Sequence, residues 1–170
     1  MLTIYPITTL ALVLALIVYF ALSVNVGRAR ATWNVPAPQA SGHPEFDKRY
    51  RVQMNTLEQL ALFVPGVIVG APVLGDMVAG GLALLWSIGR IVFASAYYTD
   101  PAKRGPGFGL TLLPSLVLLL AGAWGAISAL ILKRQPARHP SECRAGGVLR
   151  RAGELPGTGA FRSASRRPRR

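Results

Sequence analysis

The 170-residue sequence contains one cysteine, two histidines and seven acidic residues. A single cysteine excludes an intrachain disulfide, and His43 and His139 lie far apart with no cluster of cysteines or carboxylates around them. The chain therefore lacks the ligand set of a zinc or di-metal site, and we expect no metal. It also lacks a glycine-rich phosphate loop and the G-x-S-x-G pattern, which argues against a P-loop nucleotide-binding protein and an α/β-hydrolase.

Basic residues, in contrast, outnumber acidic ones by 19 to 7, for a net charge of +12. A strongly basic chain suggests a polyanionic partner such as nucleic acid. However, residues 133–170 contain 11 of the basic residues and only two of the acidic ones. Residues 1–132 are close to electrically balanced, and the mean hydropathy of the whole chain is +0.37. This distribution excludes a single soluble basic domain and predicts a hydrophobic domain followed by a basic tail.

The tail, residues 133–170, is rich in Arg, Pro, Gly, Ser and Ala and has few large apolar side chains. This composition predicts disorder. We favour a tail without function. The alternative is that the basic cluster that ends residues 163–170 is attracted to the headgroups of anionic lipids. No interleaved aromatic residues support binding to nucleic acid, so we expect no nucleic-acid partner.

Four long apolar segments occupy residues 1–132. A helix needs about 20 mostly apolar residues to cross the ~30 Å hydrocarbon core of a membrane. Residues 1–27 contain no charged side chain, and their apolar run exceeds the ~7–15 residues of a signal peptide's hydrophobic region. We therefore expect a membrane helix there. The four segments predict an all-α membrane protein, a four-transmembrane-helix bundle with helices at about residues 4–26, 46–73, 77–98 and 110–132.

Proline, glycine and polar residues separate these segments into a first loop after Arg28, a tight turn at Gly75 and Asp76, and a third loop at 99–109. With four crossings, the first and third loops lie on the same side of the membrane. That side carries most of the basic residues of the membrane domain, namely Arg28, Arg30, Lys48, Arg49, Arg51, Lys103 and Arg104. The positive-inside rule favours cytoplasmic first and third loops, although the basic start of the tail argues against this orientation.

Ionisable side chains inside membrane helices are costly and mark functional sites. Arg51, Asn55 and Glu58 are spaced i, i+4 and i+7, which places them on one face of the second helix. Arg90 and Tyr97 share a face of the third helix, and the antiparallel arrangement brings them to a similar depth. These five residues predict a polar pocket beside the first and third loops.

The charges of this pocket leave two interpretations open. In the first, Glu58 and Arg90 neutralise each other and hold the bundle together, with Asn55 as an interhelical contact and Tyr97 as an interfacial aromatic residue. In the second, the pocket binds a ligand, because one carboxylate cannot neutralise all the arginines of the pocket and the loops, Arg30, Arg51, Arg90 and Arg104. Their excess suits a small ligand with several carboxylates, which arginine binds through two parallel hydrogen bonds.

The segment Tyr50–Glu58, YRVQMNTLE, fits an R-x-x-x-N-x-x-E pattern, and it is followed by Arg90, Tyr97 and the segment DPAKRGPGF at 100–108. In these residues the sequence resembles the family of membrane-associated proteins in eicosanoid and glutathione metabolism, the superfamily of microsomal glutathione transferases and leukotriene C4 synthase. The resemblance covers about residues 1–132 and is greatest to its bacterial branch. It implies a homotrimer in a bacterial inner membrane, with glutathione bound as a cosubstrate between neighbouring subunits.

The resemblance also implies roles for particular residues. One subunit supplies Arg51, Asn55, Glu58, Tyr97 and Arg104, and the next supplies Arg30 and Gln53. Arg104 is implied to activate the glutathione thiol, and Arg90 is a further candidate to bind a carboxylate. A thiol with a pKa of about 8.5 is mostly protonated at pH 7, and a nearby guanidinium favours the thiolate. The cosubstrate brings its own nucleophile, so the protein needs none.

Three positions depart from the leukotriene-synthase pattern: Phe93 replaces a tyrosine, Gln59 an aromatic residue and Ala31 a second arginine. These departures favour a general glutathione transferase or peroxidase, acting on small lipophilic electrophiles or peroxides, over leukotriene synthesis. A non-enzymatic binding or scaffold protein of the same fold is the alternative. A small multidrug exporter also has four helices, but it needs a carboxylate in the first helix, and residues 4–26 contain none.

Overall fold

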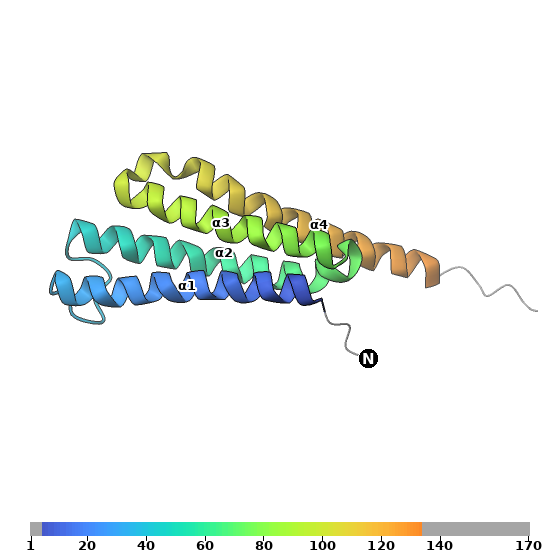
Figure 1. Cartoon of the computed structure of the whole chain (residues 1–170), viewed down its shortest axis with the longest axis horizontal. Coiled ribbons are helices and arrows are strands. Elements are labelled where there is room, and N and C mark those ends of the chain that lie inside the picture. The colour runs from blue at the N-terminus through green and yellow to red at the C-terminus, as the bar shows by residue number, and fades with distance from the viewer. Residues whose placement is uncertain (1–4, 134–170) are drawn as a thin grey trace, which may run out of the picture. The chain divides into compact units, whose positions relative to one another are not determined.

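The computed structural model describes residues 5–133. In this range the chain forms α1 (Pro6–Thr32), α2 (Pro44–Leu74), α3 (Asp76–Thr99), the short 3-10 helix η1 (Pro101–Arg104) and α4 (Gly105–Lys133). The four α-helices alternate in direction, so the α1–α2 loop and η1 lie at the same end of the bundle (Figure 1). Each is long and apolar enough to cross a membrane. The predicted all-α, four-helix membrane bundle is confirmed.

The helices extend further than hydropathy predicts. α1 continues to Thr32 and includes Arg28 and Arg30, and α4 begins at Gly105, within the segment 99–109 that the sequence predicts to be a loop. Hydropathy locates the residues that lie in hydrocarbon, whereas backbone hydrogen bonding allows a helix to continue into the headgroup region. The predicted disorder of the tail falls outside the described residues, which end at Lys133.

Local chemistry explains how α4 begins so early. Asp100 caps η1 through its side chain, and Pro101 occupies the first turn, where a missing N–H costs no hydrogen bond. Pro106 likewise falls in the first turn of α4. Gly107 lies directly against the backbone and side chain of Phe93 in α3, where any added Cβ atom overlaps them. The lack of a side chain at Gly107 therefore lets the start of α4 pack against α3.

The core lies between the helices, and α2 and α3 each contact both α1 and α4. At its centre, Phe63 of α2 stacks on Trp86 of α3, with ring centroids 4.4 Å apart. The same cluster contains the buried alanines Ala11, Ala15, Ala79 and Ala83. Small residues at helix contacts are typical of membrane bundles, because they let backbones approach closely.

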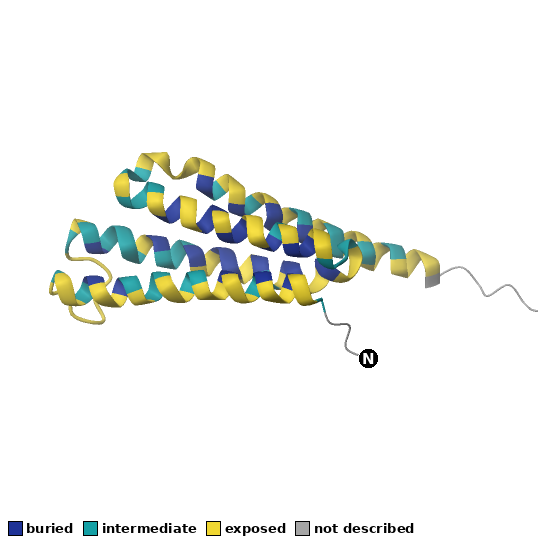
Figure 2. Cartoon of the chain, viewed as in Figure 1, coloured by how far each residue is buried: buried dark blue, intermediate teal, exposed yellow. Residues whose placement is uncertain are grey.

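The outward faces of the helices are exposed (Figure 2). Many of the exposed residues are large and apolar. Leu10, Phe20, Ile68 and Met77 are examples from three helices, each with about two thirds or more of its surface exposed. A soluble protein rarely exposes so extensive an apolar surface, whereas lipid tails cover one in a bilayer. Together with the four long apolar helices, this surface identifies an integral, multi-pass membrane protein.

Candidate functional site

A cavity of about 790 Å³ lies among the α1–α2 loop, α2, α3 and the start of α4. Segments far apart in the sequence therefore meet at one end of the bundle (Figure 1). The lining residues are Ala40, Ser41, Tyr50, Arg51, Met54, Asn55, Glu58, Phe93, Tyr97, Arg104, Gly105 and Phe108. The cavity lies at the depth that the sequence predicts for the polar pocket.

Five of the eight predicted site residues line this cavity. Arg51, Asn55 and Glu58 come from one face of α2, as their spacing predicts, Tyr97 comes from α3, and Arg104 ends η1. Arg51, Glu58 and Arg104 are exposed, whereas Asn55 and Tyr97 are half-buried. The guanidinium carbon of Arg104 lies 5.9 Å from the centre of the Tyr97 ring. The polar wall thus carries two cations, one carboxylate, one amide and one phenol.

The rest of the lining is mostly apolar and comes largely from Tyr50, Met54, Phe93 and Phe108. Phe93 is 2% exposed, and its ring centroid lies 5.7 Å from that of Tyr97. Sequence reasoning did not assign Met54 to the site, although it lies three residues after Arg51 and shares its helical face. Phe108 ends the segment DPAKRGPGF that carries the family resemblance, but its place in the cavity wall depends on the packing of α4 against α3. The cavity therefore joins a polar wall to a hydrocarbon wall.

Arg90, also a predicted site residue, does not line the cavity. It is fully buried, and its Nη2 donates a hydrogen bond of 3.0 Å to Oδ1 of Asn55. Its guanidinium carbon also lies 4.3 Å from the centre of the Phe93 ring. No ion pair joins Arg90 to Glu58 within residues 5–133, because Glu58 is exposed and Arg90 has no exposed surface. Asn55 is thus the interhelical contact that one interpretation of the sequence predicts.

Arg30 and Gln53 lie away from the cavity of their own chain. Nη1 of Arg30 donates a 2.7 Å hydrogen bond to the carbonyl oxygen of Gln39, and Arg30 lines a second hollow of about 530 Å³ beside the α1–α2 loop. Nε2 of Gln53 donates a 2.9 Å hydrogen bond to the hydroxyl of Tyr19 and so links α2 to α1. One chain alone does not bring these two side chains to the site formed by the other predicted residues.

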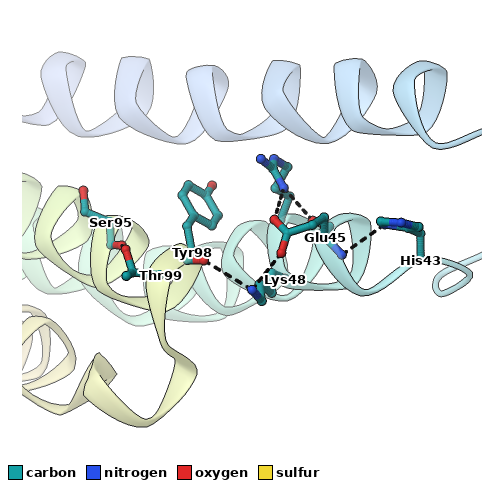
Figure 3. A network of polar contacts seen from close by, with 7 residues as sticks. His43, Glu45, Lys48, Ser95, Tyr98 and Thr99 are labelled. Carbon is teal, nitrogen blue, oxygen red and sulfur yellow. Dashed lines mark hydrogen bonds and ion pairs between the residues drawn. The ribbon is translucent and has the colours of Figure 1, made fainter.

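A polar network fixes the same end of the bundle, and Figure 3 shows most of its members. Nδ1 of His43 caps α2 by accepting a 3.3 Å hydrogen bond from the backbone N–H of Glu45. Glu45 forms ion pairs with Lys48 at 2.8 Å and Arg49 at 3.1 Å. Lys48 also donates to the carbonyl oxygen of Tyr98, near the end of α3, at 3.4 Å. The network joins the two helices that carry most of the cavity wall.

Several known proteins are similar in sequence to this chain over most of the membrane domain. Residues 8–124 match the model of the MAPEG family. The chain is 43% identical over 107 residues to an uncharacterized protein of the cyanobacterium Synechocystis sp., a match that covers 63% of this chain and 78% of that protein. It is 32% identical over 113 residues to human microsomal glutathione S-transferase 2, which covers 66% of this chain and 76% of the human protein. The bovine protein of the same name is 29% identical over 113 residues, with the same coverage.

Proposed function

The chain belongs to the MAPEG family, as the resemblance in its sequence predicts, and from this premise we propose that it is a glutathione-dependent membrane transferase or peroxidase. The family and the similarity to microsomal glutathione S-transferase 2 support a glutathione-related function in the membrane. The observation that carries the proposal is the set of polar residues on one cavity wall. Glutathione has two carboxylates, an ammonium group and a thiol, and this wall offers a complementary group to each.

In this proposal the α2 residues bind the ends of the tripeptide. Arg51 holds a carboxylate through two parallel hydrogen bonds, for which a planar guanidinium is well suited. Glu58 binds the ammonium group, and Asn55 donates a hydrogen bond to an anionic group of the ligand. All three are on one helical face, so a single rigid element sets the distances between the charges that they bind.

In this proposal Arg104 and Tyr97 lie beside the glutathione thiol, and Arg104 activates it. A positive charge beside the sulfur favours the thiolate, and a pKa lowered by two units corresponds to about 2.7 kcal/mol. Arg104 lies over the Tyr97 ring, on the wall that it shares with Arg51. The sulfur lone pair then forms a bond to an electrophilic carbon, and the leaving group departs with its bonding electrons. The apolar wall beside Phe93 and Met54 receives the small lipophilic electrophile or the peroxide.

The proposal includes a homotrimer in which a neighbouring subunit completes each site. Arg30 and Gln53 lie outside the cavity of their own chain. In the proposed assembly, a second copy would supply them to the site. It also includes a bacterial inner membrane with the α1–α2 loop and η1 in the cytoplasm. Exposed basic side chains at this end of the bundle, such as Arg28 and Lys103, support that orientation.

Binding and activity measurements on the 170-residue protein, purified in detergent, test this function directly. We expect glutathione binding by isothermal titration calorimetry, a trimeric mass by native mass spectrometry, and conjugation of glutathione to chlorodinitrobenzene. A parallel assay with an organic hydroperoxide separates peroxide reduction from conjugation. No heat of binding at millimolar glutathione would contradict the proposal.

A non-enzymatic binding or scaffold protein is the second candidate. It is favoured by Phe93, which offers the cavity a hydrocarbon ring with no hydroxyl group for a reacting sulfur. Glutathione binding without turnover of either substrate supports this candidate over the transferase or peroxidase.

A further inference from the structure

Arg90 is a fully buried cation with one hydrogen bond to the described part of the chain. That bond runs from Nη2 to Oδ1 of Asn55, while Nε and Nη1 have no hydrogen-bond partner within residues 5–133. A buried guanidinium is costly, and each hydrogen bond that it makes offsets part of the cost. The bond to Asn55 therefore constrains both side chains.

The chemistry of this bond determines which way the Asn55 amide points. Arginine carries only hydrogen-bond donors, whereas a carboxamide has an oxygen acceptor on one side and an NH₂ donor on the other. Only the oxygen of Asn55 can meet Arg90, because a flipped amide would bring N–H groups against N–H groups. We propose that Arg90 is a positioning residue that holds the Asn55 carboxamide with its NH₂ group toward the cavity.

The surroundings of Arg90 prevent it from moving aside. Its guanidinium carbon lies 4.3 Å from the centre of the Phe93 ring and 5.9 Å from that of Trp86. Trp86 is itself fully buried and stacks on Phe63 at 4.4 Å. Close packing of this kind restricts the rotamers open to the Arg90 side chain. The donor group of Asn55 is thus oriented before any ligand arrives, which lowers the entropic cost of binding.

Gln59 lies on α2 between the residue that contacts Arg90 and the residue that stacks on Trp86. On α2 it follows Asn55 by four residues and precedes Phe63 by four, while the antiparallel α3 presents Arg90 and Trp86 to those two residues. Gln59 is buried, and its Oε1 has no partner within residues 5–133. When Asn55 is replaced by alanine, this oxygen is a candidate acceptor for Arg90 on the same helix. We therefore expect the Asn55→Ala variant to fold.

The orientation makes Asn55 a donor, which favours an acceptor such as a carboxylate or thiolate at this point of the cavity and disfavours an ammonium group. Its relevance to glutathione rests on the proposed function. The orientation itself is a property of the ligand-free protein, so it can be tested without glutathione.

The first experiment measures the amide directly. The chain has only three asparagines, Asn25, Asn34 and Asn55, so ¹⁵N-labelled asparagine gives three side-chain NH₂ signal pairs, and Asn55→Ala assigns one of them. A carbonyl oxygen bonded to a cation strengthens the amide resonance and slows rotation about the C–N bond. In Arg90→Met we expect that rotation to become several-fold faster for Asn55 alone. Asn25, which donates to the Tyr98 hydroxyl at 3.2 Å, is the internal control.

An Asn55 signal pair with unchanged shifts and rotation rate in folded Arg90→Met would overturn the proposal. If Arg90→Met does not fold, the same amide rotation rate measured in Arg90→Lys tests the proposal instead. Lysine keeps a buried charge and a donor, so the Asn55 rotation should stay within about twofold of the wild-type rate. Rotation in the lysine variant as fast as that of the solvent-exposed Asn34 amide would equally overturn the proposal.

The second experiment is a double-mutant cycle with glutathione as the probe. Arg90→Met and Asn55→Ala should each lower the affinity for glutathione about tenfold, because each removes the contribution of one hydrogen bond to an anionic group. The double variant should lose no more than either single variant, because Arg90 acts through Asn55. Additive losses would contradict this role and indicate a structural effect of Arg90. If the wild type binds no glutathione, the proposed function fails, while the amide measurement still decides the positioning role.

Discussion

The carboxylate of Asp76, at the start of α3, caps the first turn of α1. Its Oδ1 accepts a 2.8 Å hydrogen bond from the backbone N–H of Thr8, and Oδ2 accepts one of 3.1 Å from Ile7. The hydroxyl of Thr8 donates in return to the carbonyl oxygen of Asp76 at 3.1 Å. The first N–H groups of a helix have no partner within it, and its N-terminus favours negative charge. One side chain thus joins two helices at the end of the bundle away from the cavity (Figure 1).

Replacement of Asp76 by alanine should lower the free energy of unfolding by about 1–2 kcal/mol, the usual cost of a lost helix cap. Thermal unfolding in detergent, followed by circular dichroism, measures the loss. Asp76→Asn keeps one acceptor oxygen and should lose less. An alanine variant that unfolds at the wild-type temperature would show that the cap contributes nothing.

A second prediction concerns the close approach of α4 to α3. Gly107→Ala places a methyl group against the backbone of Phe93, so we expect a loss of about 1–3 kcal/mol in stability. Gly109→Ala is the matched control, because within residues 5–133 no atom outside its own stretch of helix lies within 4 Å of a Cβ atom added there. Alanine at this helical position should be neutral or slightly stabilising. Equal melting temperatures for the two variants would contradict the packing described for Gly107.

Arg104 is predicted to act on the thiol more than on binding. Arg104→Ala should lower the turnover of glutathione with chlorodinitrobenzene at least tenfold, because the sulfur loses the charge that favours its thiolate. Glutathione affinity should change less. Its neighbour Lys103 is 74% exposed and faces Asp100 at 3.9 Å, so Lys103→Ala is a matched loss of charge outside the cavity. Unchanged turnover in Arg104→Ala counts against the proposed mechanism and favours a scaffold role.

Arg51 is predicted to hold a carboxylate of the ligand. Arg51→Ala should weaken glutathione binding by about 10- to 100-fold, in the range of a hydrogen-bonded charge pair. Calorimetry measures the change. Arg28→Ala also removes an exposed charge near the same end of the bundle, but not from the cavity, and it should leave the affinity unchanged. Equal losses in the two variants would indicate a general effect of surface charge instead of a site.

Part of the candidate site was predictable because it depends on a single helix. Arg51, Asn55 and Glu58 share a face of α2 through spacing alone, and the structure places all three on the cavity wall. The partner of Arg90 was not predictable in the same way. Several polar residues of α2 lie near that depth, and the rotation of α2 about its axis selects Asn55 and leaves Glu58 exposed. Spacing along the chain carries no information about that rotation.

The partners of Gln53 and Asp76 also could not be predicted from spacing along the chain. Gln53 bonds to Tyr19, 34 residues away, and Asp76 bonds to Thr8, 68 residues away. Each contact depends on how α1 lies against its neighbours. Neither residue has a local pattern that indicates its partner.

The sequence by itself determined that the chain crosses the membrane four times and that one face of its second helix is polar. Both are local properties, since lipid requires runs of about 20 apolar residues and helical geometry sets which residues share a face. Only the tertiary structure decided that α4 begins at Gly105 and that Asn55, not Glu58, accepts a hydrogen bond from Arg90. Those outcomes depend on atoms of different helices meeting at close range, where the contact of Gly107 with Phe93 sets the position of one helix against another.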